Sequence, residues 1–287
     1  MGNWILTTQR VLKGWGRVSD QDWPYYSGRW PPTEPPGMDA LAKASRMRAY
    51  FRCRTVEECC AILNRGGLVS AAFEIDDSWI ASDGLIDDPR DHRPQMNHSI
   101  VLLGADEANE TFRFIHSWGP GWGEGGWGSL PFRYWSDRLL EAWVPDDRDA
   151  AAVDRPTDRD FILIERTAED PWGNTIHMIE VEDPIKDEMM AWAILRQFPT
   201  SLDIDEFFVR PAFRRKGHGR RLARSVNSLR SKTDLPVTAW VPHADAAHTQ
   251  AQDAVFRRMG LRRTPSVERW AAVRVADGRV RDSAGSH

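Results

Sequence analysis

The sequence predicts an α+β domain in the N-terminal half and an α/β domain with an open, mixed sheet in the C-terminal half. Length is the first reason, because 287 residues correspond to two domains at about 100–200 residues each. The second is the polar stretch 145–160, which indicates an exposed linker. The third is the different order of elements on its two sides. The predicted limits are 1–144, 161–275 and a flexible tail, 276–287.

In the N-terminal half, helix and strand signals alternate with turns rich in Gly and Trp. A capping box, Thr55 to Glu58, predicts a helix over residues 55–64, and Gly66 follows its end. A shorter helix is predicted over residues 4–12. Apolar runs of strand length cover 68–75, 98–104 and 112–116.

In the C-terminal half, the order of elements predicts a crossover connection after an antiparallel start. Strands are expected over 161–165, 175–182, 191–198, 203–209 and 236–241. Two helices are expected over 217–230 and 247–259, the second ended by Gly260. This pattern is typical of an open mixed sheet.

Composition and charge exclude several classes of protein. A net charge of -4 provides no general attraction for nucleic acid or anionic membranes, so neither partner is expected. No apolar run reaches the roughly 18 residues of a membrane span, and the first residues do not resemble a signal peptide. Three cysteines are too few for a disulfide framework. We expect a cytoplasmic protein.

The most informative segment is a basic turn with spaced glycines, which follows the strand ending at Val209. Gly217 and Gly219 allow backbone N–H groups to approach an anion, and the helix that begins there adds partial positive charge. Nine Arg or Lys residues and no acidic residue lie between Arg210 and Lys232. These features predict a pyrophosphate site. The alternative is a solvated basic helix face, with or without a nucleic-acid contact.

This turn resembles the acetyl-CoA motif of the GNAT superfamily of N-acetyltransferases, which is Arg/Gln-x-x-Gly-x-Gly/Ala after a strand ending Val-x-Pro. Val209, Pro211, Arg214, Gly217 and Gly219 match in register. The resemblance covers about residues 160–275 and implies a splayed central sheet that receives the pantetheine arm. It assigns acetyl-CoA binding to Phe208, Val209, Arg214, Arg215, Lys216, Gly217, His218, Gly219 and Arg220.

The resemblance also implies roles in catalysis. Backbone amides near Phe208 and Val209 would polarise the thioester carbonyl. Glu206 stands where many members carry an acid facing the acceptor amine, which must be neutral to attack. An ion-paired or solvated Glu206 is the alternative. The sequence does not identify the acceptor, which is a small molecule or a protein.

Two departures from the family pattern concern the same reaction. Many members have a Tyr that protonates the leaving thiolate, and Phe256 stands at that position without a proton to donate. The helical pair between the first two strands is also shortened, since only about residues 166–174 separate them.

A second motif lies in the first half, where Ser117-Trp118-Gly119 and the glycines after it follow a predicted strand. With His98 opening an earlier strand, this motif resembles the papain-like (C1) cysteine peptidases, over roughly residues 1–144. In that family the His pairs with a Cys and is oriented by an Asn before Ser-Trp-Gly. His116 occupies the place of that Asn.

The catalytic set of that family is incomplete in this sequence. No Cys-Gly-x-Cys-Trp segment is present, and Cys53, Cys59 and Cys60 have the pattern of buried structural thiols. Their spacing matches no zinc site, and we expect no metal. His98 and His116 are therefore expected to be an inactive remnant of a truncated partial papain-like fold.

These observations predict an acetyl-CoA-dependent N-acetyltransferase that carries an inactive papain-like domain. One alternative is a peptidase whose Cys segment lies upstream or on another chain. Another is a non-enzymatic binding protein in which both domains are degenerate. Because the truncated domain would expose an apolar face, a partner chain or self-association is also expected.

Overall fold

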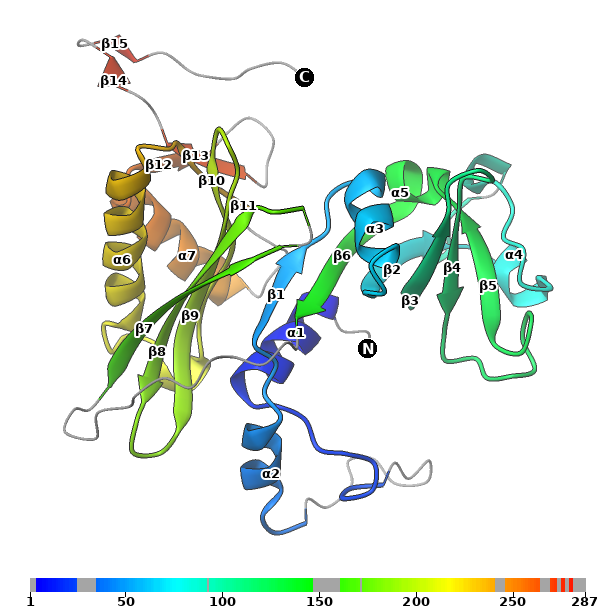
Figure 1. The fold of residues 1–287 in the computed structure, drawn as a ribbon, viewed down its shortest axis with the longest axis horizontal. Coiled ribbons are helices and arrows are strands. Elements are labelled where there is room, and N and C mark those ends of the chain that lie inside the picture. The colour runs from blue at the N-terminus through cyan, green and yellow to red at the C-terminus, as the bar shows by residue number, and fades with distance from the viewer. Residues whose placement is uncertain are drawn as a thin grey trace. The chain divides into compact units, whose positions relative to one another are not determined.

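The structure, a computed structural model, describes residues 4–24, 35–91, 93–146, 161–170, 172–240, 246–263, 269–272, 275–276 and 279–280. It divides into two compact units, Met1–Ala150 and Ala151–His287 (Figure 1). No helix within the described ranges is both long and apolar enough to cross a membrane.

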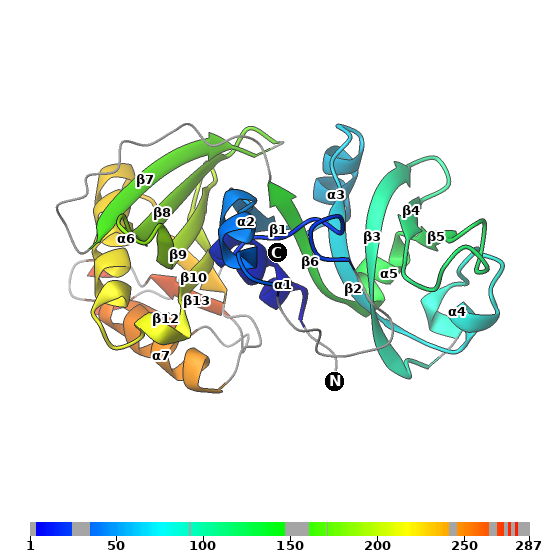
Figure 2. The same cartoon turned by 90° about the horizontal axis from the view of Figure 1, so that it is seen from below.

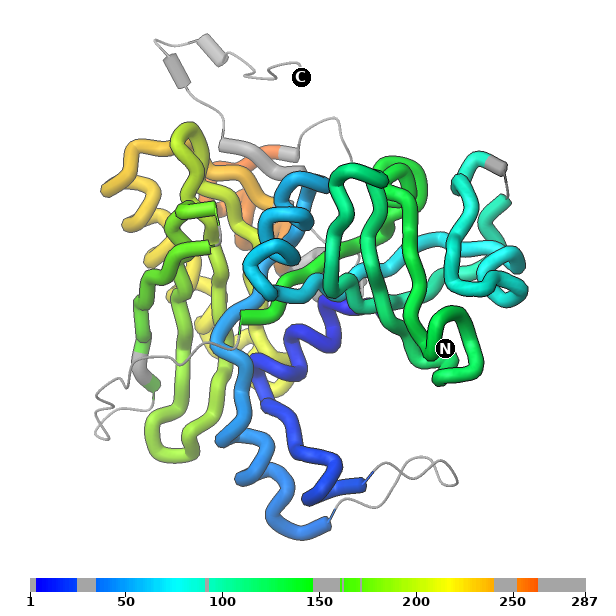
Figure 3. Tube along the Cα trace, turned by 45° about the vertical axis from the view of Figure 1, so that its right-hand side comes forward, coloured from blue at the N-terminus to red at the C-terminus, as the bar shows by residue number. Residues whose placement is uncertain are grey.

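The N-terminal unit contains a six-stranded antiparallel sheet in the order β1-β6-β2-β3-β4-β5. The last three strands in this spatial order, β3, β4 and β5, are neighbouring green segments in Figure 3. The strands are β1 (Ala49–Arg52), β2 (Val69–Ile75), β3 (Met96–Asp106), β4 (Thr111–Ile115), β5 (Trp127–Pro131) and β6 (Leu139–Asp146). The helices are α1 (Ile5–Gly14), α2 (Met38–Ala44), α3 (Val56–Leu63), α4 (Ser78–Ala81) and α5 (Arg133–Arg138), with a 3-10 turn η1 (Pro89–Asp91).

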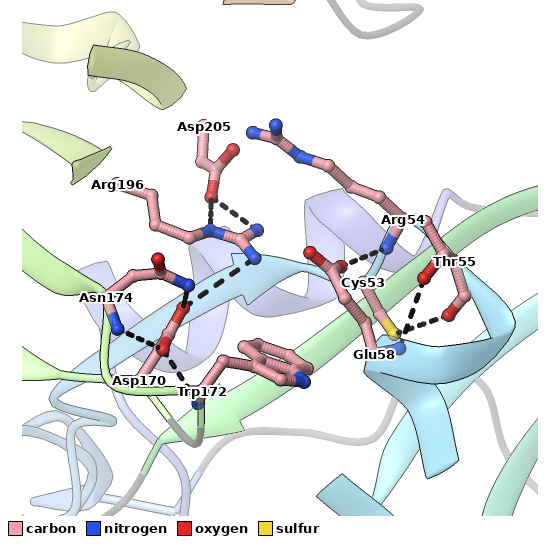
Figure 4. A network of polar contacts seen from close by, with 9 residues as sticks. All are labelled: Cys53, Arg54, Thr55, Glu58, Asp170, Trp172, Asn174, Arg196 and Asp205. Atoms are coloured by element: carbon pink, nitrogen blue, oxygen red, sulfur yellow. Dashed lines mark hydrogen bonds and ion pairs between the residues drawn. The ribbon is translucent and has the colours of Figure 1, made fainter. Parts of the chain in front are cut away.

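Local hydrogen bonds explain where the helices begin. Thr55 Oγ1 accepts from the N–H of Glu58 at 3.1 Å, and Glu58 Oε2 accepts from the N–H of Arg54 at 2.7 Å (Figure 4). The predicted cap of α3 is therefore confirmed. At α1 the cap comes from a distant residue, because the carboxylate of Glu141 on β6 accepts from the first two N–H groups of the helix.

The end of β6 differs from the expected linker. Pro145 and Asp146, predicted to begin the linker, continue the strand opposite β1, where Asp146 forms an ion pair with Arg48. Cross-strand pairing and a buried charge partner thus extend the strand into a polar stretch. The remainder of that prediction, residues 147–160, lies outside the described residues.

The C-terminal unit contains a seven-stranded sheet in the order β12-β13-β11-β10-β9-β8-β7. Its only parallel pair among the described strands is β10 with β11, so the predicted mixed sheet is confirmed. The strands are β7 (Ile162–Glu169), β8 (Thr175–Asp183), β9 (Glu188–Gln197), β10 (Leu202–Val209), β11 (Val237–Trp240), β12 (Leu261–Arg263) and β13 (Arg269–Ala272). A separate two-stranded sheet joins β14 (Val275–Ala276), which spans the predicted start of the tail, and β15 (Arg279–Val280), which lies within it.

The helices α6 (His218–Thr233) and α7 (Ala246–Arg258) cover one face of this sheet (Figure 2). Leu222 and Val226 of α6 and Phe256 of α7 pack with the buried side chains of β8 to β11. As expected from the shortened connection, β7 and β8 are joined by residues 170–174 without a helix in the described part.

Candidate functional sites

The turn between β10 and α6 has an unusual backbone. Arg215 and Gly217 both adopt left-handed conformations, with φ of 62° and 88°. Such residues turn successive N–H groups toward one side and create a concave site for an anion. The N–H groups from Arg215 to Gly219 make none of the backbone hydrogen bonds of the described chain. The N–H of Arg220, also an expected donor, is used by the first turn of α6, where it bonds Gly217 O at 3.0 Å.

The sheet opens beside this turn. Parallel pairing of β10 with β11 runs only from Leu202 opposite Val237 to Ile204 opposite Ala239. Beyond Ile204, the strand pairs among the described residues join β10 to β9 alone, after a bulge at Asp205. A bulge bends the strand that contains it. Within the described part of the chain, the end of β10 therefore has an open edge on the side of β11, as the predicted splay requires.

Only one of the two predicted carbonyl-polarising amides faces this open edge. The N–H of Arg210 donates to Met190 O of β9 at 3.0 Å. Because the polar backbone groups of a strand alternate in direction, Phe208 also faces β9, whereas Val209 faces the open edge. The carbonyl of Val209 faces the same side, because its oxygen accepts a hydrogen bond from Arg214 Nε at 3.4 Å and not from β9. The Phe208 amide therefore points toward β9, and that of Val209 is the one on the open side.

The open edge has further partners, one of which the sequence did not reveal. Gln252 of α7 donates from Nε2 to the carbonyl of Phe207 at 2.8 Å. The N–H of Phe207 donates to Oε1 of Glu206 at 2.8 Å. Glu206 is only 2% exposed, so its carboxylate is buried at the start of the open edge. A single Gln within a helix carries no sequence signal that would have identified Gln252.

The basic side chains of the turn lie against aromatic rings. Lys216 Nζ is 5.2 Å from the centre of the Phe213 ring, and the guanidinium of Arg221 is 4.0 Å from that of Phe161. His218 is 7% exposed, and its Nδ1 has no hydrogen-bond partner in the described chain. Burial, with smaller contributions from Arg221 and Lys216, lowers the pKa of His218. His218 is therefore neutral near pH 7 and adds a polar group without charge.

The bulge at Asp205 is held by a buried ionic network. Arg196 on β9 is 0% exposed and donates from Nε and from one terminal nitrogen to Asp205, at 3.2 and 2.9 Å (Figure 4). The other terminal nitrogen lies 3.9 Å from Asp170, which also accepts from two N–H groups of the β7–β8 turn, those of Trp172 and Asn174. This network fixes the point at which β10 leaves β11.

The bulge also interrupts the alternation of side chains along β10. Strict alternation places Asp205 with Phe207 and Val209, and the latter two do pack toward the core beneath α6. Asp205 instead contacts Arg196, whose neighbour Leu195 belongs to that core, so Asp205 is on the opposite face. The extra residue of the bulge interrupts the two-residue period.

Phe256 is a core residue. Its side chain is 1% exposed and meets the ring of Phe207 edge-on, with 5.7 Å between ring centres. It therefore has a packing role and no proton to offer a leaving group.

In the N-terminal unit, the register of β3 with β4 brings the two predicted histidines together. Val101 pairs with Ile115, which places His116 near His98, and the rings meet edge-on with centres 5.3 Å apart. The ring of Trp118 packs against both imidazoles. Its centre is 4.9 Å from that of His98 and 4.4 Å from that of His116. The expected juxtaposition is thus present.

The chemistry of this pair differs from that of an Asn–His pair. His116 Nδ1 accepts from the N–H of Trp118 at 3.1 Å, so a neutral His116 carries its proton on Nε2. Nε2 of His116 and of His98 are buried without a hydrogen-bond partner in the described chain. Burial, followed by the effect of His98, lowers the pKa of His116 to about 4, and burial lowers that of His98. Both rings are therefore neutral near pH 7.

No cysteine completes this pair. Cys53, Cys59 and Cys60 are buried, and none of the hydrogen bonds or ring contacts of the two histidines involves a thiol. Burial, with the charges of Glu107 and Glu57, raises the pKa of Cys60 to about 11. The Cys60 thiol is therefore protonated at neutral pH. Within the described ranges, no three His, Cys, Asp or Glu residues group as metal ligands would.

A known family model matches most of the C-terminal region. Residues 136–260 match the model of the acetyltransferase (GNAT) family. The match includes the turn after β10 and both α6 and α7, and it begins within α5 of the first unit. A putative GNAT-family acetyltransferase of Desulfovibrio desulfuricans is 16% identical, with a TM-score of 0.28, over 33% of this chain and 66% of that one.

Relatives of the N-terminal half are peptidase-like. An uncharacterized peptidase C1-like protein of Acanthamoeba polyphaga mimivirus is 22% identical over 159 residues, which are 50% of this chain. This chain spans about half the length of that relative, 51%. Xylellain, a cysteine protease from Xylella fastidiosa, is 23% identical with a TM-score of 0.44, over 52% of this chain and 63% of that one. The resemblances to GNAT acetyltransferases and to papain-like peptidases are both confirmed.

Proposed function

We propose that the C-terminal unit, which contains a GNAT-family domain, is an acetyl-CoA-dependent N-acetyltransferase. The observation that carries this proposal is the anion site of the turn, where left-handed Arg215 and Gly217 present N–H groups directly beside the open edge of β10. A phosphate site next to an unpaired strand edge suits an extended ligand with a pyrophosphate and an amide-containing arm.

In the proposed reaction, the N–H groups from Arg215 to Gly219 hold the pyrophosphate, and the N–H of Val209 donates a hydrogen bond to the thioester carbonyl oxygen. The acceptor amine attacks the carbonyl carbon, the carbon–sulfur bond breaks, and CoA leaves as the thiolate. Negative charge on the oxygen is stabilised by the Val209 N–H. Glu206 takes the proton of the amine, and the thiolate leaves without a proton from Phe256.

The proposal is tested with Glu206→Gln. This variant keeps an acceptor oxygen for the N–H of Phe207 and removes the base, so calorimetry should detect acetyl-CoA binding close to that of the parent. Acetylation of an amine found in an acceptor screen should fall by at least about 10²-fold. Glu165→Gln on β7, three strands away from β10 in the sheet, is the matched control and should keep the parental rate. An unchanged rate in Glu206→Gln refutes its role, and absence of acetyl-CoA binding by the parent refutes the function itself.

We also propose that His98 and His116 do not support peptide cleavage with the thiols of this chain. The three thiols are buried, that of Cys60 is protonated at neutral pH, and two neutral imidazoles are poorly suited to generating the thiolate that an acyl-enzyme requires. The N-terminal unit then serves as a binding module. The alternative is a peptidase whose Cys comes from an upstream segment or another chain.

A peptidyl probe directed at thiols distinguishes these functions. The native chain should not be labelled, because Cys53, Cys59 and Cys60 are buried, whereas urea-unfolded chain should be labelled fully. Mass spectrometry of the intact protein provides the readout. Labelling of the native chain that disappears in His98→Ala would contradict the proposal.

A further inference from the structure

Strand β7 forms one edge of the sheet of the C-terminal unit (Figure 2). Among the described strands it pairs with β8 alone, over all of its eight residues and without a bulge. It also contains no Pro or Lys. Bulges, Pro and Lys are the features by which proteins commonly protect an exposed strand edge from further pairing. β7 is therefore a long, regular edge that can accept another strand.

The backbone groups on the free side of β7 belong to every second residue. The N–H of Asp170 donates to Asn174 O at 2.9 Å, which continues the register of β7 with β8 by one pair. Because these groups alternate in direction along an antiparallel strand, those of Leu163, Glu165 and Thr167 point away from β8. The side chains of these three residues are exposed. An added strand can therefore reach their N–H and C=O groups.

A pocket of about 280 Å³ opens beside this edge, between β7, β8 and α6. Glu165 pairs with Ile179 and Thr167 with His177, so these side chains share the sheet face that α6 covers. The lining residues of α6 are three and four positions apart and lie along one side of the helix: Ser225, Leu229 and Lys232. A strand added to β7 would direct every second side chain toward this pocket.

The pocket has charged groups of opposite sign at its two ends. β7 and α6 both run opposite to β10, so Lys232 lies toward Thr167, and Glu165 lies at the other end. The side chains of Glu165 and Lys232 make no ion pair or hydrogen bond with the described residues. His177 is already engaged, because its Nε2 is 2.8 Å from Oε1 of Gln197. A complementary occupant has a cation near Glu165 and an anion near Lys232.

A second copy of this chain does not provide that complement. Two antiparallel registers match the free backbone groups of β7 with those of another β7 along most of the strand. One places Glu165 opposite Glu165 of the other copy, and the other does the same for Arg166. Like charges directly opposite each other destabilise a strand pair. The favoured occupant is therefore a segment of different sequence.

We propose that the free edge of β7 binds an extended peptide segment as an additional antiparallel strand, with the sequence pattern acidic-x-basic-x-apolar. The acidic side chain lies opposite Thr167 and meets Lys232, the basic one lies opposite Glu165, and the apolar one lies opposite Leu163. Main-chain hydrogen bonds provide affinity, and the pocket provides specificity. None of the residues proposed for acetyl transfer belongs to this site, so acetylation measured without the peptide does not depend on it.

The first test measures the charge pattern, by fluorescence anisotropy of a capped, labelled peptide with Asp-Val-Lys-Val-Leu at its centre. The full chain should bind it saturably. A peptide with Asp and Lys exchanged should bind about tenfold or more weakly, because each charge then meets its like. Lys232→Glu should weaken binding about fivefold or more and regain it with a peptide in which Lys replaces Asp. Arg262→Glu, at an exposed position of β12 outside the pocket, is the matched control and should bind like the parent.

The second test separates strand addition from attraction between charges. N-methyl groups on the Asp, Lys and Leu residues of the peptide remove the three donors that face β7, and affinity should fall by about 10²-fold. N-methyl groups on the two Val residues face away from β7 and should leave the affinity near that of the unmodified peptide. Because only the peptide is changed, the protein stays folded in both measurements.

Three results would overturn this assignment. One is the absence of saturable binding by the parent chain, and another is an equal loss of affinity with the two methylated peptides. The third is a parent chain that is dimeric in light scattering and does not bind the peptide, which would assign the edge to a second copy. Each of these leaves the proposed acetyltransferase function intact, since acetyl-CoA binding is measured separately.

Discussion

Gly219→Val is expected to abolish acetyl-CoA binding while the protein stays folded. A Cβ at Gly219 would point between Val209 at the end of β10 and Val255 of α7, 3.7 Å from a methyl carbon of each. That is ordinary contact for the protein, but the larger Val side chain would fill the space through which the ligand reaches the free N–H groups. Loss of two or more charge-assisted hydrogen bonds corresponds to at least about 10²-fold in affinity. Calorimetric titration with acetyl-CoA measures this loss of affinity.

Two further variants separate ligand exclusion from damage to the helix. Gly219→Ala adds only the Cβ and should have intermediate affinity with a native circular dichroism spectrum. Ser228→Val introduces the same β-branched side chain at an exposed position of α6 and should bind like the parent. Gly217 is less informative, because its φ of 88° strains any other residue. Parental affinity in Gly219→Val would show that the phosphates bind elsewhere.

Arg196→Met is expected to destabilise the C-terminal unit by about 3–5 kcal/mol, the usual cost of removing one partner from a buried ion pair. Asp205 and Asp170 would remain buried without the cation that contacts both. Hydrogen exchange of peptides from β9 and β10 reports on this unit alone. It should show faster exchange in both strands.

Arg262→Met, at an exposed position of β12, is the control and should change stability by less than about 0.5 kcal/mol. Adding Asp205→Asn to Arg196→Met removes one of the two buried carboxylate charges that lack a cation. The double variant should therefore recover part of the lost stability. If Arg196→Met exchanges like the parent, the network does not hold the bulge. Acetyl-CoA affinity should then also be unaffected.

Much of the fold could be predicted from local patterns. The strands now seen as β8 and β10 and the helices α6 and α7 fall within a few residues of their predicted limits, because each has strong periodicity and a clear end. The sequence patterns do not predict β1, β5 and β6 of the first sheet or β12 and β13 of the second. β6 contains Glu141 and Asp146, whose burial depends on distant partners, the N–H groups of α1 and the side chain of Arg48. Such contacts join residues far apart in sequence and leave no periodic signal.

For the candidate sites, the sequence by itself determined residue types and order: the glycines and basic residues of the turn, the pairing of His98 with His116, and the lack of a tyrosine at Phe256. Only the tertiary structure decided which groups face the open edge. A one-residue bulge at Asp205, held by Arg196 of the adjacent strand, moves Asp205 to the opposite face from Phe207, and hydrogen bonding to β9 turns the Phe208 amide away. A two-residue period holds only within an uninterrupted strand, and long-range contacts decide where that strand is interrupted.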